Sequence, residues 1–76
     1  MTQFKEQDCR AAVQRLPPRQ REVLKGLALG QPRKVIASEL SISTETVNSH
    51  CSELYRRLNL RCVADAVRLA VRANLV

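Results

Sequence analysis

The sequence predicts an all-α fold with a helix-turn-helix at its centre. Residues 33–58 contain two apolar helical stripes, separated by a turn of only three residues, 41–43. The small Ala37 lies in the middle of the first stripe, where a methyl group lets a second helix cross close by at a steep angle. Pro18 and Gly30 mark the start and the end of an earlier helix. Together these observations favour short helices packed on one another.

The first predicted helix begins near Pro18 and ends at Gly30. Proline suits the first turn because its missing N–H has no partner inside the helix there. Leu16 precedes the helix and is expected to pack back on its first turn. Gly26 costs about 1 kcal/mol relative to alanine in mid-helix, which close packing against another helix would explain. The inner face carries Val23, Leu24, Leu27 and Ala28.

The second and third predicted helices cover residues 33–40 and 44–58. Pro32 leaves the second helix without a side-chain cap, whereas Ser43 is a good N-cap for the third. If Ser41 in the turn takes a positive φ, strain of about 1 kcal/mol follows. The third helix is expected to bury one stripe with offsets of four, three and four. That stripe consists of Val47, Cys51, Leu54 and Leu58.

The fourth predicted helix covers residues 63–73 and has more than one apolar row. Cys62 is a poor N-cap, and Asn74 is able to take the left-handed cap conformation at the other end. One row can pack on the first helix. The second apolar row either contacts a second partner or packs into a core that is small enough to use both rows. The rows are Ala66, Leu69 and Ala73, and Val63, Val67, Ala70 and Val71.

Residues 1–15 are polar and mixed in charge. They form either a lead-in helix or the remnant of a linker, and a frayed tail is an equal alternative.

Composition points to the kind of partner. The 76 residues include 13 Lys and Arg against 7 Asp and Glu, a net charge of +6, and a small basic domain favours a polyanionic partner. A chain of this size buries only about 60–65% of its unfolded surface, so the core is thin. No apolar run approaches the roughly 18 residues of a membrane span, and the N-terminus lacks a signal-peptide core. We therefore expect no membrane partner.

The cysteines and the single histidine predict neither a metal site nor a cofactor. Cys9, Cys51 and Cys62 form an odd set without CxxC spacing. His50 adjoins Cys51, and adjacent helical residues point about 100° apart, so they do not converge on one ion. The absence of a disulfide framework suits a reducing cytosol and predicts a cytoplasmic protein. No Ser/His/Asp set and no phosphate loop is visible, so we expect no enzyme.

The exposed face of the third helix carries candidates for nucleic-acid contact. Asn48, Ser49 and Ser52 are short and polar, and they can donate and accept hydrogen bonds at base edges. Residues 17–43 contain five basic and two acidic residues, net +3, whereas residues 44–60 contain two of each. This division suits phosphate contacts from the flanks and base contacts from the centre. The phosphate candidates are Lys34, Thr44, Thr46, His50, Arg56 and Arg57; for His50, a half-buried position beside the turn is an equal alternative.

From Leu16 onward, about four-fifths of the chain resembles the DNA-binding domain of the LuxR/FixJ/NarL family of bacterial transcription regulators. The matching motifs are LPPRQREVL, IASELSIS, TVNSH and ADAVRLAVRANLV, in that order. The resemblance implies a compact four-helix domain in residues 16–76 that reads bases from the positions of Asn48, Ser49 and Ser52. It also implies a twofold dimer on DNA through the last helix, and RNA polymerase is a further candidate partner. The dimer residues would be Val63, Ala66, Leu69, Ala70 and Ala73.

The chain departs from the family pattern at several positions. Pro32 replaces the usual capping Ser or Thr, Val35 replaces an acidic residue, and Ser41 replaces Gly. Family members often place Lys or Arg at the reading positions, and this chain has neither there. Glu53 lies nearby, where its carboxylate either accepts from a cytosine amino group or repels phosphate. Base preference therefore does not follow from the sequence.

Two other classes of binding protein fit part of the pattern. The terminal region of an RNA polymerase sigma factor also has a basic LP..QREV helix and a helix-turn-helix, but it would end soon after the recognition helix. An interaction module that pairs with a full-length regulator and blocks it would not bind DNA itself. We predict instead a sequence-specific regulator of transcription that binds double-stranded DNA. It is either the effector domain of a response-regulator-like protein or a standalone small regulator.

Overall fold

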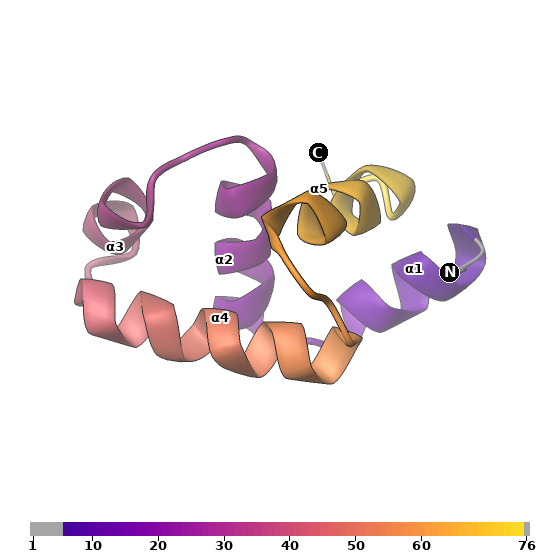
Figure 1. Ribbon diagram of the computed structural model, residues 1–76, viewed down its shortest axis with the longest axis horizontal. Helices are drawn as coiled ribbons and strands as arrows, with labels where there is room; N and C mark the ends of the chain where they lie inside the picture. Colours follow the sequence, from indigo (N-terminus) through magenta and orange to yellow (C-terminus); the bar gives the residue numbers. More distant parts are fainter. Residues whose placement is uncertain (1–5, 76) are drawn as a thin grey trace.

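The computed structural model describes residues 6–75 as five α-helices with short connections. They are α1 (Glu6–Gln14), α2 (Pro18–Ala28), α3 (Arg33–Leu40), α4 (Thr44–Leu58) and α5 (Val63–Arg72). In Figure 1, α2 stands near the centre, α4 runs along the lower edge, and α3 lies at the N-terminal end of α4. No strand occurs in residues 6–75, and a helix-turn-helix is formed by α3 and α4. The predicted all-α fold is therefore confirmed.

The α1 helix is additional to the four predicted helices. It packs against α5, and its Cys9 and Val13 side chains are buried. Among the alternatives for residues 1–15, a lead-in helix therefore describes residues 6–14, and residues 1–5 lie outside the described part of the chain. The division into a lead-in segment and a domain that begins at residue 16 stays a prediction.

The core is organised by α2, which contacts α3, α4 and α5. Leu16 is buried ahead of its first turn, as predicted, and Ala28 is the one expected inner-face residue that is only half-buried. The α3 helix adds Ile36 and Ala37 to the same core. This packing fixes the position of α3, and with it the path of the chain into α4. The buried residues of α2 are Gln20, Val23, Leu24, Gly26 and Leu27.

The α2 and α3 helices pack closely at Gly26. A Cβ added there would lie 2.8 Å from Cγ1 and 2.9 Å from Cδ1 of Ile36. Because Ile36 is itself buried, it has little room to move away. The close packing predicted at Gly26 is thus confirmed. Gly30 follows with φ of 81° and ends α2, also as predicted.

Left-handed residues end the later helices. Ser41 has φ of 58°, so the strain expected in the turn is present. The N–H of Ile42 donates to the carbonyl of Ala37 at 3.0 Å, a pattern that caps the last turn of a helix. Asn74 has φ of 59°, as predicted, and Asn59 takes the same conformation after α4 without having been anticipated. The sharp turn at Ser41 sets the angle at which α4 leaves α3.

Candidate nucleic-acid interface

The α4 helix buries one face and exposes the other. Its buried stripe is the predicted one, with every member at most 6% exposed. This stripe fixes the rotation of the helix about its axis. As a result, Asn48, Ser49 and Ser52 are all exposed. Three short polar side chains therefore lie together on the solvent-exposed face of α4, the second helix of the helix-turn-helix. The buried residues are Val47, Cys51, Leu54 and Leu58.

Ser43 fixes the start of α4. Its Oγ accepts a hydrogen bond from the N–H of Thr46 at 3.0 Å and lies 2.9 Å from Thr46 Oγ1, so the predicted N-cap is confirmed. Thr44 and Thr46 are both exposed at this end. Free N–H groups of a first helical turn favour an anion. The fold therefore brings two of the predicted phosphate contacts to one end of α4.

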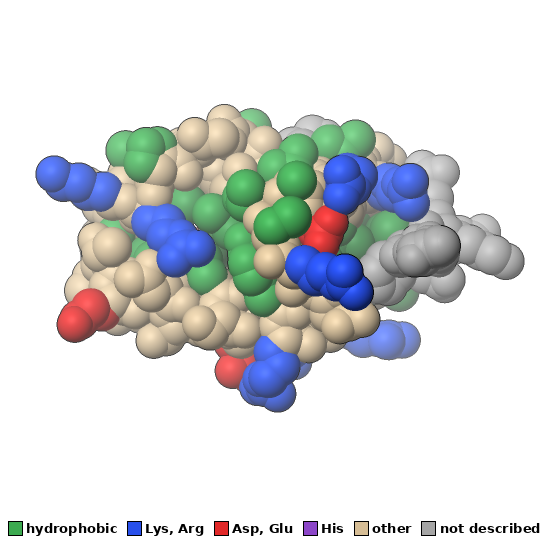
Figure 2. All heavy atoms as spheres, viewed as in Figure 1, with side chains coloured by type: hydrophobic (Ala, Val, Ile, Leu, Met, Phe, Trp, Pro, Cys, Tyr) green, Lys and Arg blue, Asp and Glu red, His purple; other side chains and the backbone are tan. Residues whose placement is uncertain are grey.

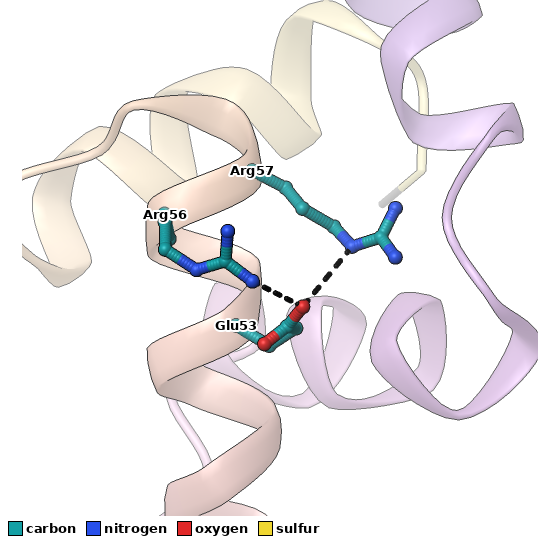
Figure 3. Close-up of polar contacts among 3 residues, drawn as sticks. All are labelled: Glu53, Arg56 and Arg57. Carbon is teal, nitrogen blue, oxygen red and sulfur yellow. Dashed lines mark hydrogen bonds and ion pairs between the residues drawn. The ribbon is translucent and has the colours of Figure 1, made fainter.

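A second charged group lies on the C-terminal half of α4. Figure 3 shows the Glu53 carboxylate between the guanidinium groups of Arg56 and Arg57. Its Oε2 is 2.5 Å from Arg56 Nη2 and 3.7 Å from Arg57 Nε. The hydrogen bond from Arg56, helped by the charges of both arginines, holds the pKa of Glu53 below its ordinary value. Glu53 is thus engaged within its own helix, and the group of three keeps a positive charge.

Arg33 is a candidate that the sequence analysis missed. It is the first residue of α3, and its Nη1 donates to Oδ1 of Asn48 at 2.8 Å. Its charge also lies near Cys51 and Tyr55, although burial is the larger effect and raises the pKa of both groups. The sequence contained a feature that could have identified Arg33. It is a basic residue at the start of the helix that precedes the recognition helix, and it follows Pro32, which cannot cap that helix.

The remaining phosphate candidates are placed on two helices. Lys34 is exposed on α3, and His50 is half-buried on α4. The half-buried position was one of the two alternatives for His50, and its phosphate contact stays a prediction. Figure 2 shows Lys and Arg side chains over α3 and below α4, and mostly uncharged surface over the N-terminal half of α4 apart from an acidic side chain at its start. Basic flanks beside a recognition helix without net charge are what the sequence favoured, and the exposed Glu45 belongs to the first turn of that helix.

Part of the outer face of α5 is apolar, beside the exposed Arg68 and Arg72. Val63 and Val71 are 47% and 54% exposed. Positions 63, 67 and 71 share one face because they are four residues apart, and Val67 is half-buried. Figure 2 shows hydrophobic side chains gathered over this part of the molecule, with basic residues beside them. The surplus apolar row expected on this helix is therefore present on the surface.

Three predicted dimer residues are corrected by the structure. Ala66, Leu69 and Ala70 are at most 3% exposed, because α5 packs with them against α2 and α1 of its own chain. Buried side chains cannot contact a second copy in this conformation. Of the predicted dimer set, Val63 is exposed and Ala73 is half-buried.

The start of α5 is stabilised by Asp65 instead of Cys62. Cys62 makes no side-chain cap, as predicted. Asp65 Oδ2 accepts from the N–H of Arg61 at 2.9 Å, and Oδ1 accepts from Arg68 at 2.6 Å. The backbone hydrogen bond from Arg61, followed by the contacts with Arg68, lowers the pKa of Asp65. A carboxylate at this end also suits the positive end of the helix dipole.

Among the side chains that the structure describes, those of residues 9–75, His, Cys, Asp and Glu form no group arranged to hold a metal ion. The helices of this part of the chain are also too short or too polar to cross a membrane.

Comparison with known proteins gives one consistent result. Residues 14–70 match the family described as bacterial regulatory proteins, luxR family. The chain is 36% identical over 70 residues to the transcriptional regulatory protein FixJ of Bradyrhizobium diazoefficiens, covering 92% of this chain and 34% of FixJ. It is 41% identical over 61 residues to the probable transcriptional regulatory protein NarL of Mycobacterium tuberculosis, covering 80% and 28%.

The fold agrees with these matches. The crystal structure of full-length FixJ from B. japonicum superposes with a TM-score of 0.84 at 35% identity, over 93% of this chain and 35% of that one. The chain thus spans about a third of the length of the relatives it matches.

Proposed function

The chain belongs to the luxR family of bacterial regulatory proteins, and from that premise we propose that it binds specific sequences of double-stranded DNA with α4 in the major groove. Relatives are named as transcriptional regulators, so the class of function is transcription regulation. In the proposed complex, Asn48, Ser49 and Ser52 contact base edges.

One observation carries the proposal. The exposed side chains of α4 at positions 48, 49 and 52 are short and uncharged, with Glu45 one turn before them, while cations lie on α3 and toward the C-terminal end of α4. Phosphate contacts fix the position of a protein on the duplex, and base contacts specify the sequence. Lys34, Arg56 and Arg57 are the cationic phosphate contacts. Thr44, Thr46 and His50 complete the proposed phosphate set.

The outer face of α5 supports a homodimer on DNA. Val63 and Val71 give it exposed apolar area, but the helix has only 10 residues. An interface of that length falls below the roughly 1,200 Å² of stable complexes. We therefore expect a monomer in free solution at micromolar concentration. Two half-sites on one duplex raise the effective concentration and supply the missing affinity.

The wider setting follows from the family. We propose that the protein acts in the cytoplasm and that RNA polymerase is its second partner when it regulates a promoter. Because the chain covers about a third of its relatives, a signal-receiving region in the same polypeptide and a standalone regulator both remain compatible with the proposal.

Selection of bound duplexes from a random pool tests the proposal directly. We expect an imperfect palindrome with half-sites about one helical turn apart. A titration of binding against salt then measures the phosphate contacts. About three to four neutralised phosphates per monomer predict a log–log slope near −3, doubled for a dimer. No enrichment together with no salt dependence would reject DNA binding.

A further inference from the structure

Arg33 and Asn48 connect α3 to the reading face of α4. Arg33 begins α3, and Asn48 lies in the second turn of α4, fifteen residues later. The 2.8 Å contact between Arg33 Nη1 and Asn48 Oδ1 has the length usual for a hydrogen bond with a charged donor, and both side chains are exposed. Charge on the donor strengthens such a bond.

This contact fixes which end of the Asn48 amide faces outward. A guanidinium group has five N–H donors and no acceptor. Only the amide oxygen can therefore face Arg33, and the Nδ2 amino group must point the other way. An isolated asparagine on a helix surface has no such constraint and can offer either end to a base.

Arg33 has further neighbours on α4. Cys51 and Tyr55 lie close enough for the Arg33 charge to act on both. The nearest acidic residue further along α4, Glu53, is already paired with Arg56 and Arg57. The Glu53 carboxylate is thus engaged with its own helix, and Arg33 donates a hydrogen bond to Asn48 on α4.

We propose, on the basis of the function proposed above, that Arg33 is a positioning residue that makes Asn48 a hydrogen-bond donor and gives the site a preference for guanine over adenine. Asparagine recognises adenine by accepting from N6 with its oxygen while donating to N7. That pairing needs the oxygen turned to the base, away from Arg33. Guanine presents two acceptors, N7 and O6, in the major groove, which suit an outward amino group beside the spare donors of Arg33.

The test uses four duplexes that differ only at the base pair facing Asn48, identified as the position where Asn48→Ala removes the preference. We expect the unmodified protein to bind the guanine duplex about 10-fold more tightly than the adenine duplex, within the discrimination typical of a good pair. Arg33→Ala removes the constraint on the Asn48 amide. The affinity for the adenine duplex should then equal or exceed the affinity for the guanine duplex. Arg33→Lys keeps a donor next to the oxygen and should retain part of the guanine preference.

Lys34→Ala is the matched control, because Lys34 is the next residue along α3 and is also an exposed cation. It should weaken binding to all four duplexes by a similar factor. If Arg33→Ala does the same, or if the unmodified protein prefers adenine, the positioning role is overturned while sequence-specific binding stands. Equal affinity of the unmodified protein for selected and random duplexes would instead overturn the proposed function and this inference with it.

Discussion

The two helices with the most contrasting surfaces are α4 and α5. Each buries one stripe in the same core, but the α4 stripe is built from a valine, a cysteine and two leucines, whereas the α5 stripe contains two alanines and one leucine. The outer faces differ more. The α4 face is polar and includes Asn48 and Ser52, whereas the α5 face has an apolar part that includes Val63 and Val71.

This difference separates two kinds of recognition in one small domain. A polar face of short side chains can exchange hydrogen bonds with base edges, whereas exposed valines gain free energy only when another apolar surface covers them. The buried stripes hold both helices in place but do not distinguish their roles. The roles are carried by the faces that the core does not use.

The largest expected effect concerns the buried stripes. Leu54 is fully buried in α4, and Leu54→Ala should lower the free energy of unfolding by about 3 kcal/mol because it leaves a cavity. Ala70 is fully buried in α5, where space is short, so Ala70→Leu should cost about 1–3 kcal/mol through overpacking. Urea denaturation followed by circular dichroism measures both changes. A neutral Ala70→Leu would show that α5 is packed more loosely than described.

The next effect separates base contacts from phosphate contacts within α4. Ser52→Ala should cost about 1–3 kcal/mol on the selected sequence and little on random DNA. Arg56→Ala should weaken binding to both and flatten the salt slope by about one unit. Glu53→Gln removes the carboxylate between the two arginines and should strengthen binding to all sequences. If Ser52→Ala and Arg56→Ala lose affinity to the same extent on the selected sequence and on random DNA, a different face of the protein reads the bases.

The smallest effect compares how the two helices begin. Ser43→Ala removes the neutral cap of α4 and should cost about 1 kcal/mol at any pH. Asp65→Ala removes a charged group from α5, and its effect should depend on pH. The lowered pKa of Asp65 means that its contribution is present above about pH 4 and is lost as pH falls through the folded-state pKa. Thermal unfolding of the variant and of the unmodified protein at pH 7 and pH 2.5 tests this. Equal losses of thermal stability for Asp65→Ala at the two pH values would contradict it.

Much of the fold followed from the sequence because its signals are local. Pro18, Gly30 and Ser43 mark helix ends through backbone chemistry, and the α4 stripe follows from helical spacing alone. Burial of Ala66, Leu69 and Ala70 did not follow, since periodicity shows that a helix has two apolar rows but not which row faces the core. The packing of α5 against α2 and α1 decides that, and the polar residues 1–15 gave little indication of the contribution of α1.

The candidate site was predicted less completely for a similar reason. The exposure of Asn48, Ser49 and Ser52 follows from the stripe opposite them. The contact between Arg33 and Asn48 joins two helices across the turn, so it depends on the crossing angle of α3 and α4. The left-handed Ser41 sets that angle, and the spacing of residues along the sequence does not give the distance between two side chains on different helices.

The division of roles between α4 and α5 is the central claim, and binding to duplexes with one and with two half-sites tests it most directly. Val71→Asp changes an exposed residue of α5, so folding should be retained, which circular dichroism checks. We predict unchanged affinity for one half-site and loss of cooperativity on two. Equal losses on both duplexes with folding intact, or full cooperativity in the variant, would contradict the claim.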